Sequence, residues 1–528
     1  MAPDDYDARH WDVIVIGTGI GGGTVGRRLA EKGASVLFLE RGGMGHRSER
    51  HGLSMSVIDP AARRTRGYWP TSIPLACEGQ VLSLGESLGA GVGGTSVFYA
   101  AAFERPERHD LDDTETRAHP TGGWPVPYDQ FAPYLDDAEK IFAVNGGQDP
   151  LSQESALTLH APPDLSAGDA ALFRKMEDVG LHPYRLRSAI RHVDGCMECI
   201  GVKCPRDCKM DGRSAGIEPA LKTGNAALVP NFQVTQLTGS KGRVEGVVGC
   251  RDGETRRVTG RIVIMSAGGL GSPALLLASA SDAWPDGCAN SSGQVGRGLM
   301  FHLHDLVAVW PPRGLPLGYP AKCISLRDLY YVDGQRFGIF QSLGLSASYG
   351  NILHALRQRL ERSRAAKIPM LYDLARIPAL AADRILGSAR IFSGSIEDFP
   401  YDTNRVELGH PSDQDSLKLT YVMTDELRGR CRDYRRLLSK RFRGLRTMVL
   451  TQQPELNYGH PCGTVRFGHD PRTSVLDANC RSHDIHNLYC VDAAFMPTST
   501  GVNPSLTIAA NALRVSKHIL EVLTTQNA

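Results

Sequence analysis

The 528-residue sequence lacks the long apolar runs and the strong charge imbalance that mark several large classes of protein. No segment has 18 or more consecutive apolar residues, which argues against a transmembrane helix. The formal net charge is only +2, so the composition gives no sign of a nucleic-acid partner or an acidic membrane surface. With 41% hydrophobic and 22% charged residues, the composition is that of a globular protein, and the length favours more than one domain.

The N-terminal segment and the cysteines bear on location. Residues 1–10 are polar and lead straight into an apolar segment, so we expect no charged and then apolar signal peptide. Twelve cysteines are scattered through a large chain, which favours a reducing compartment. We therefore predict a cytoplasmic protein.

The strongest signal in the sequence lies between Trp11 and Gly42. Hydrophobic patterning there predicts a strand at 13–16, a helix at 24–32 and a second strand at 35–39. A strand, a helix and a strand in this order are typical of the parallel unit that begins a Rossmann-like domain.

Three glycines between the first strand and the helix form the pattern G-x-G-x-x-G. Gly17 allows a tight turn, Gly19 lets the backbone approach a pyrophosphate, and Gly22 lets helix and strand pack closely. The helix N-terminus then offers free N–H groups to the phosphates. Glu40 follows 23 residues after Gly17, where a carboxylate accepts hydrogen bonds from ribose hydroxyls. We predict a dinucleotide site rather than a purely structural glycine turn, and nicotinamide enzymes share this pattern.

A second glycine-rich stretch runs from Leu82 to Tyr99, with glycines at 85, 89, 91, 93 and 94. So many glycines do not make a stable helix, but they suit a backbone that wraps closely around a flat ligand. The polar, basic segment at 46–66 is expected to be a surface loop.

These stretches and several later ones resemble the glucose–methanol–choline (GMC) oxidoreductase family of FAD enzymes. The motifs that carry the resemblance are the Rossmann start, GVGGTS at 91–96, GWPVPY and PYLDDAEK within 123–140, RIVIMSAGGLGSP at 261–273, and the block from 460 to 510. The resemblance is weakest from 305 to 395.

The resemblance implies an α/β fold (α+β overall) with two domains. One is a Rossmann-like FAD-binding domain assembled from separate stretches, and the other is a substrate domain built on an antiparallel sheet. The expected boundaries are 11–110, 220–300 and 465–528 for the FAD-binding domain, with 111–219 and 301–464 for the substrate-binding domain.

The resemblance also implies FAD contacts beyond the Rossmann glycines and Glu40. They fall on Arg41, Gly93, Gly94, Ser96, Val234, Asp492 and Asn503. The backbone of Val234 is expected at the adenine, and Asp492 near the phosphate and ribityl end, with a turn cap as the alternative for Asp492. Because Gly93–Tyr99 contains no His or Cys, we expect the FAD to be noncovalent.

Two residues near the C-terminus match the positions of the family's catalytic pair. In the family, a His before an x-x-G-T turn faces the flavin, and a polar residue before the final helix completes the pair. His460 and Asn503 match these two positions. Alcohol oxidation sends a hydride to flavin N5 and a proton to a base, and an imidazole titrates in the right range. The Asn503 amide can donate to the developing alkoxide, and the same residue can also cap the helix that follows.

The resemblance therefore predicts FAD-dependent oxidation of an alcohol to an aldehyde or ketone, with His460 as the base. We expect a sugar or aminoglycoside hydroxyl in a natural-product pathway as the substrate, and oxygen or another electron acceptor. The alternatives are an oxidase of a hydrophobic alcohol such as a sterol, a nicotinamide-dependent dehydrogenase, and a flavin electron-transfer dehydrogenase subunit.

Four cysteines form a cluster with the spacing C-x₂-C-x₄-C-x₃-C. They are Cys196, Cys199, Cys204 and Cys208. Four thiols could hold zinc, but the x₄ gap departs from ferredoxin-type iron–sulfur spacing. We predict no metal site, with reduced thiols or local disulfides in a surface loop. Neighbouring Lys203, Arg206 and Lys209 should lower the thiol pKa values.

Two other features have no assigned role. His302 and His304 alternate on an expected strand and favour a structural role over metal binding. Residues 356–366 and 371–390 have helical patterning, with a break expected at Pro378. This pair of helices is expected to be solvated on one face, with a lid or docking helix as the alternative.

Overall fold

The computed structural model describes residues 5–45, 47, 66–84, 88–154, 159–361, 368–410 and 413–525. Gly85 and most of the basic segment at 46–66 lie outside the described residues, and so does the end of the helix expected at 356–366. Among the described residues, no helix has both the length and the apolar character needed to cross a membrane.

The first of two large sheets contains the predicted Rossmann-like unit. Its strands are β1 (His10–Ile16), β2 (Val36–Leu39), β6 (Ala226–Val229), β7 (Gln233–Ser240), β8 (Arg243–Arg251), β9 (Glu254–Met265) and β20 (Leu488–Cys490). β1 lies between β2 and β9, and β6 and β20 extend this parallel layer on its two sides. β7 and β8 form an antiparallel extension on the N-terminal half of β9.

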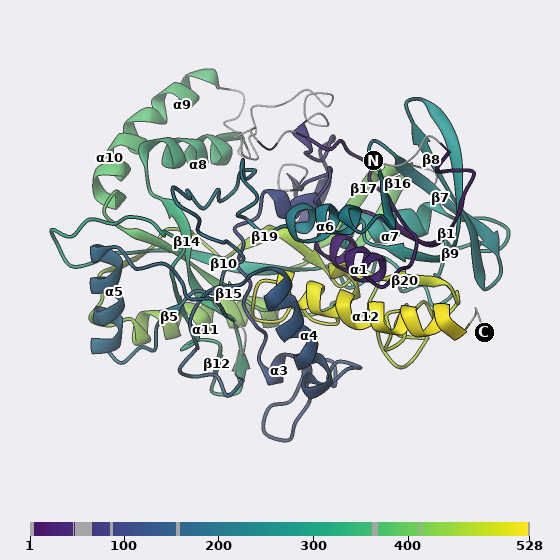
Figure 1. Cartoon of the computed structure of the whole chain (residues 1–528). Coiled ribbons are helices and arrows are strands. Elements are labelled where there is room, and N and C mark those ends of the chain that lie inside the picture. Colours follow the sequence, from purple (N-terminus) through teal and green to yellow (C-terminus); the bar gives the residue numbers. More distant parts are fainter. Residues whose placement is uncertain are drawn as a thin grey trace.

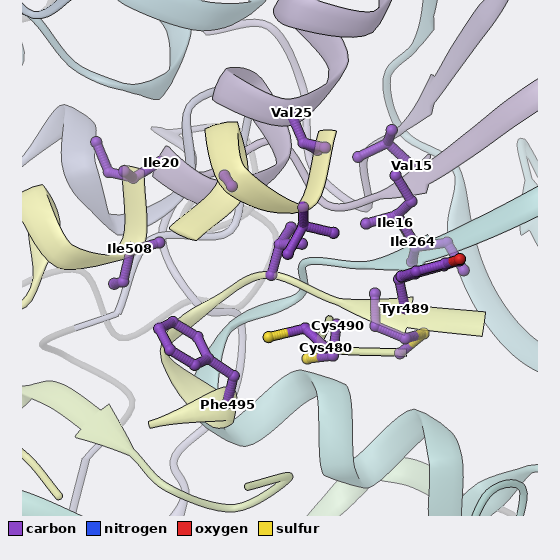
Figure 2. Close-up of a cluster of buried hydrophobic side chains, with 14 of the residues drawn as sticks. Val15, Ile16, Ile20, Val25, Ile264, Cys480, Tyr489, Cys490, Phe495 and Ile508 are labelled. Atoms are coloured by element: carbon purple, nitrogen blue, oxygen red, sulfur yellow. The ribbon is translucent and has the colours of Figure 1, made fainter. Parts of the chain in front are cut away.

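Helices from distant parts of the chain cover this sheet (Figure 1). They are α1 (Ile20–Glu31), α4 (Tyr128–Ile141), the π-helical turn η3 (Gly212–Ile217), α6 (Glu218–Lys222), α7 (Gly268–Ala278) and α12 (Ser505–Thr525). α1 packs against α12 and η3, and α12 packs against α4. Figure 2 shows Val15 and Ile264 from adjacent strands in one apolar cluster with Val25 of α1 and Ile508 of α12.

α1 begins at Ile20, four residues earlier than predicted. Its first turns contain Gly21, Gly22 and Gly23, which the sequence pattern assigned to a turn because glycine weakens helices. A Cβ on Gly21 would lie 2.3 Å from the carbonyl oxygen of Val491, so another chain segment packs directly on this helix. Close packing at the glycines, rather than helix propensity, places the start of α1.

The second large sheet is antiparallel throughout. Its strands are β5 (Tyr184–Arg185), β10 (Met300–Val309), β11 (Ile324–Leu326), β14 (Phe340–Ser346), β15 (Arg390–Ile396), β18 (Thr447–Val449) and β19 (Glu455–Cys462). The order is β18-β10-β15-β14-β11-β5, with β19 also paired to β10. The predicted fold class, a Rossmann-like domain with an antiparallel second domain, is confirmed.

Smaller elements complete the fold. A four-stranded sheet contains β16 (Arg405–His410), β17 (Asp413–Tyr421), β3 (Pro74–Cys77) and β4 (Gln80–Ser83), and a two-stranded one contains β12 (Tyr331–Val332) and β13 (Gln335–Arg336). Further helices and turns are η2 (Gly94–Val97), α3 (Arg108–Leu111), α5 (Ala167–Asp178), α11 (Asp425–Arg441) and η5 (Ala493–Phe495).

The domain boundaries stay a prediction, and the packing supports one revision of them. α4 and η3 contribute buried residues to the core of the first sheet, although both fall inside the predicted substrate-binding stretch 111–219. We propose that 128–141 and 212–219 belong with the FAD-binding domain.

The region without an assigned role forms three helices away from both chain termini (Figure 1). They are α8 (Tyr349–Glu361), α9 (Pro369–Leu374) and α10 (Arg376–Leu386). The break falls at Ala375 rather than at Pro378, because Pro378 lies in the first turn of α10, where its missing N–H costs nothing. Helical structure also ends at Leu386, before the predicted Arg390, which begins β15.

Candidate active site

A cavity of about 610 Å³ is lined by residues of both large sheets. The first sheet contributes the carboxyl ends of β1 and β2, together with the residues that follow β9, and open α/β sheets bind their ligands at this edge. The second sheet contributes side chains from β10, β14, β15 and β19. Both predicted catalytic residues and most of the predicted FAD contacts line this one cavity; Gly22 and Gly93 do not.

The glycines after β1 have three different environments. Gly17 has φ +97°, and a Cβ there would lie 2.3 Å from the carbonyl oxygen of Ser266. A Cβ on Gly22 would lie 2.2 Å from the oxygen of Gly17, so this glycine allows close packing. Gly19 faces open space and lines the cavity. These environments agree with the three roles expected in a dinucleotide motif.

The N-terminus of α1 fits a pyrophosphate. Its N-cap residue, Gly19, makes no side-chain capping bond, and the first turn contains no acidic residue. The free N–H groups and the helix dipole are therefore directed toward the cavity. The buried hydroxyl of Ser266 also lines the cavity and has no partner among the described residues. A bound FAD would thus find donors at Gly19, Ile20 and Ser266.

Glu40 is buried and connects the two glycine-rich stretches. Its Oε2 accepts hydrogen bonds from the backbone N and the hydroxyl of Thr18, at 3.1 and 2.5 Å. Its Oε1 accepts from the backbone N of Gly42, and the Thr18 hydroxyl in turn accepts from the backbone N of Gly93. The carboxylate thus holds the loop after β1 in addition to its predicted contact with ribose.

The other predicted FAD contacts line the cavity with partners of their own. Arg41 pairs with Asp415 at 2.8 Å and lies over the ring of Trp69. Ser96 donates to the carbonyl of Gly93 at 2.6 Å. Val234 is buried in β7, at the edge of the cavity.

Asp492 already serves as a cap. Its Oδ1 accepts from the backbone N of Ala494, which caps η5, and its Oδ2 accepts from the backbone N of Gly268 and the hydroxyl of Ser272. The turn-cap alternative therefore describes this residue, which also lines the cavity.

His460 contacts the buried His302, and the pair has a defined tautomer. Nε2 of His302 lies 3.0 Å from the carbonyl of Thr500, which only accepts, so this nitrogen carries the hydrogen. Its Nδ1 is therefore an acceptor, and Nδ1 of His460, 3.1 Å away, must donate to it. Nε2 of His460 is then the unprotonated nitrogen. The Nδ2 of Asn457 lies 3.2 Å from Nδ1 of His460, but both atoms are donors in this tautomer, so they make no hydrogen bond with each other.

Both histidines are neutral. Burial lowers the pKa of His302 to about 4. Burial, with smaller contributions from His302, His304 and Lys322, holds the pKa of His460 well below its usual range. A neutral imidazole is able to take up a proton, although a lowered pKa makes it a weaker base than a free histidine.

Asn503 lies just before α12 and is oriented by a strand of the second sheet. Its Oδ1 accepts from Nε2 of Gln341 on β14, at 2.7 Å. Because the oxygen is engaged, the NH₂ group of Asn503 is left to donate within the cavity. The sequence did not single out Gln341.

The second sheet lines the cavity with both polar and apolar residues. The polar ones from its strands and connecting segments are His304, Lys322, Gln341, Ser393, Ser395, Glu455, Asn457, Tyr458 and His460, and the apolar ones are Leu343, Leu345, Leu456 and Pro461. This wall can therefore offer hydrogen bonds to a ligand as well as apolar contact.

The cysteine cluster borders the cavity through Ile200 and Gly201. Sγ of Cys204 lies 3.3 Å from Sγ of Cys208, and all twelve cysteines are free thiols in this structure. Among the described residues, no three His, Cys, Asp or Glu side chains are grouped closely enough to hold a metal ion.

The prediction of lowered thiol pKa values is right for one residue of the cluster. A hydrogen bond from Cys208 lowers the pKa of Cys196 to about 7. The pKa values of Cys199, Cys204 and Cys208 are raised instead. Burial raises that of Cys199, while hydrogen bonds within the cluster raise the other two. The nearby Lys209 donates to backbone carbonyls rather than to a thiolate.

Comparisons with known proteins agree with the site. Family models for GMC oxidoreductase match residues 13–304 and 400–512. The 6'''-hydroxyparomomycin C oxidase of Streptomyces lividus is 29% identical over 98% of this chain and 93% of its own length. The paromamine 6'-oxidase of Streptomyces fradiae is 29% identical over 97% of this chain and 92% of its own length. A solved structure of formate oxidase from Aspergillus oryzae has the same fold, with a TM-score of 0.68 and 14% sequence identity. The match covers 98% of this chain and 99% of the formate oxidase chain.

The chain belongs to the GMC oxidoreductase family. It is an FAD-dependent oxidoreductase that acts on CH–OH groups, as the sequence predicted. This assignment replaces the nicotinamide-dependent alternative.

Three residues of the site, of which Lys322 and Gln341 line the cavity, had no sequence signal for their role. Lys322 and Gln341 lie in the stretch where the family resemblance is weakest, and no motif surrounds them. His302 was noticed, but its contact with His460 depends on the pairing of β10 with β19, in which His302 lies opposite Asn457. Only knowledge of strand register would have shown that contact.

Proposed function

We propose that this enzyme oxidises a hydroxyl of a sugar or aminoglycoside, with His460 as the proton acceptor and Asn503 as the donor to the substrate oxygen. The observation that carries the proposal is the tautomer of His460, whose Nε2 is unprotonated on a ring that lines the cavity. Bound FAD supplies the hydride acceptor, its N5 atom.

The residues of the chain divide the remaining work. His460 takes the hydroxyl proton on Nε2 while its Nδ1–H stays bonded to His302. The NH₂ of Asn503 donates to the oxygen as negative charge develops there, and Gln341 keeps that amide from rotating. Together they fix the carbon that loses hydride.

Polar residues of the second sheet support a hydroxyl-rich substrate over a sterol. Ser393, Ser395 and His304 offer donors and acceptors to several hydroxyls. The two aminoglycoside oxidases that are 29% identical along nearly the whole chain support the same class. The proposed electron acceptor is oxygen or another acceptor, as the sequence predicted.

The test is anaerobic stopped-flow bleaching of the flavin at 450 nm with polyols, aminoglycosides and a sterol. We expect bleaching with hydroxyl-rich compounds and none with the sterol. His460→Ala should slow it by about 10²–10⁴, and Asn503→Ala by about 10²–10³. FAD occupancy is checked first in every variant. Bleaching within about threefold of wild type in His460→Ala would show that another group is the base.

A further inference from the structure

Three lysines are buried in this enzyme near the cysteine cluster, Lys203, Lys209 and Lys322, and the environments of the last two differ. Lys209 is 0% exposed, and its ammonium donates to the carbonyls of Cys199, Val202 and Tyr99 at 2.8, 2.6 and 3.3 Å. Three acceptors satisfy an ammonium group, so Lys209 holds its loop in place.

Lys322 is only 4% exposed, yet its ammonium makes no hydrogen bond or ion pair within the part of the chain that the structure describes. The residue lines the cavity with His460 and Asn503. Its positive charge is also close enough to His460 to disfavour protonation of that ring. A buried cation without a partner is costly, so the cavity needs a group that compensates it.

The nearest carboxylate of the chain does not fill that role. Glu198 is buried beside Lys322, but its oxygens accept from the backbone N atoms of Ala321 and Lys322, at 2.6 and 3.3 Å. No contact within 4.0 Å joins its carboxylate to the Lys322 ammonium. Glu198 therefore fixes the backbone that carries Lys322 and leaves the ammonium group to the cavity.

We propose that Lys322 binds a carboxylate of the substrate, so that the enzyme prefers a polyhydroxy acid to a neutral polyol or an amine. The chemistry follows from charge, because a carboxylate neutralises the ammonium and accepts charge-assisted hydrogen bonds, which are about twice as strong as neutral ones. A substrate ammonium at the same place would be repelled. This choice of substrate rests on the sugar half of the proposed function and disfavours the aminoglycoside half, whereas the binding of a carboxylate rests on neither.

The first experiment measures binding without turnover. Calorimetry on the holoenzyme compares cyclohexanecarboxylate with its neutral isostere cyclohexanecarboxamide, neither of which has a hydroxyl to oxidise. The wild type should bind the carboxylate at least about tenfold more tightly, and Lys322→Met should lose that preference while Lys322→Arg keeps it. A preference that survives in Lys322→Met, or no measurable carboxylate binding to the wild type, overturns the proposal.

Two controls separate recognition from folding. Lys322→Met removes an unpaired buried charge and should leave the thermal midpoint unchanged or raised. Lys209→Met leaves three carbonyls unsatisfied and should lower the midpoint while the carboxylate preference persists. A loss of stability in Lys322→Met equal to that in Lys209→Met would make Lys322 a structural residue and overturn the proposal.

The pH dependence adds an independent check. Burial lowers the pKa of Lys322 to about 8, with Glu198 and Glu104 opposing the shift and neutral His460 facing the same space. The ammonium exists below this pKa, so carboxylate preference should be full near pH 6 and fade as pH rises past about 8. A preference constant to pH 10 contradicts the assignment.

A turnover arm then separates this proposal from the proposed function. Three compounds differ only at one terminal carbon: it is a carboxylate carbon in D-gluconate, carries a hydroxyl in D-glucitol and carries an ammonium in glucamine. We expect kcat/KM for flavin reduction to be highest for gluconate, lower for glucitol and lowest for glucamine. Carboxylate binding without bleaching by any polyol would refute the substrate class and leave Lys322 as an anion site. If glucitol and gluconate reduce the flavin with equal kcat/KM, the role of Lys322 in substrate choice is refuted.

Discussion

His302 and His460 share one hydrogen bond, and its direction is set by a carbonyl outside both rings. The carbonyl of Thr500 requires a hydrogen on Nε2 of His302, which leaves Nδ1 as an acceptor for His460. In this arrangement a residue that does not touch the substrate decides which nitrogen of the base is free. His302 is thus a positioning residue, and the sequence favoured only a structural role for it.

Replacement of His302 tests this positioning. His302→Leu removes the acceptor, so the His460 ring should spend time in the wrong tautomer and flavin reduction should slow by about 10- to 100-fold. His302→Asn places an oxygen near the position of Nδ1 and should recover part of the rate. Stopped-flow reduction at matched FAD occupancy is the measurement. Equal rates in the Leu and Asn variants would mean that His302 only fills space.

Gln341 should act only through Asn503. Gln341→Leu frees the Asn503 amide to rotate, and we expect flavin reduction to fall by about tenfold. In an Asn503→Ala background the same change should have little further effect, because coupled residues are not additive. Ser393→Ala is the matched control, since its effect should add to that of Asn503→Ala. Full additivity for Gln341 would contradict the positioning role.

At the scale of elements, the ends of β1 and β2 are held together by one carboxylate. Glu40 follows β2 and accepts from Thr18, which follows β1, and Thr18 reaches Gly93 in the second glycine-rich stretch. The loops after β1 and β2 are therefore held to each other and to the distant stretch around Gly93 beside the cavity.

Glu40→Ala should affect both the fold and the cofactor. The variant leaves the N–H groups of Thr18 and Gly42 without their acceptor, and the free energy of unfolding of the FAD-free protein should fall by about 1–3 kcal/mol. FAD should also dissociate more readily from the variant. Chemical denaturation of the apoprotein and fluorescence titration with FAD measure the two effects separately. Glu31→Ala, on the exposed side of α1, serves as the control and should change neither quantity. An unchanged FAD affinity in Glu40→Ala would show that another group holds the ribose.

At the scale of the whole molecule, the cavity has one wall from each large sheet. A cofactor bound there contacts the Rossmann-like layer and the antiparallel layer at once. Ligand binding to the folded state alone stabilises a protein by about 2.7 kcal/mol at a hundredfold excess over Kd. FAD should therefore contribute to stability in the two layers together.

FAD is predicted to be noncovalent, because Gly93–Tyr99 contains no His or Cys. Acid precipitation should release the yellow colour into the supernatant, and added FAD should raise the thermal midpoint of the apoprotein as a single transition. Absorbance of the supernatant and differential scanning calorimetry check the two outcomes. Colour that stays with the pellet after denaturing washes would contradict the prediction.

The sequence by itself determined the features that depend on local spacing. Gly17, Gly19 and Glu40 are set by the order of strand, turn and helix, because each acts within one βαβ unit. His460 and Asn503 were found because they lie in motifs that resemble those of a known family. The antiparallel second domain was likewise expected from that resemblance rather than from any pattern between 305 and 395.

Only the tertiary structure decided how distant strands combine at the site. His302 meets His460 across 158 residues, and Gln341 meets Asn503 across 162, through pairings in the antiparallel sheet. A strand's own pattern records which face is buried but not which strand lies beside it, so these contacts had no local signal. The early start of α1 has the same origin, since packing against Val491 outweighed the weak helix propensity of its glycines. Lys322 became informative only when the structure showed it buried, with no partner for its ammonium among the residues described.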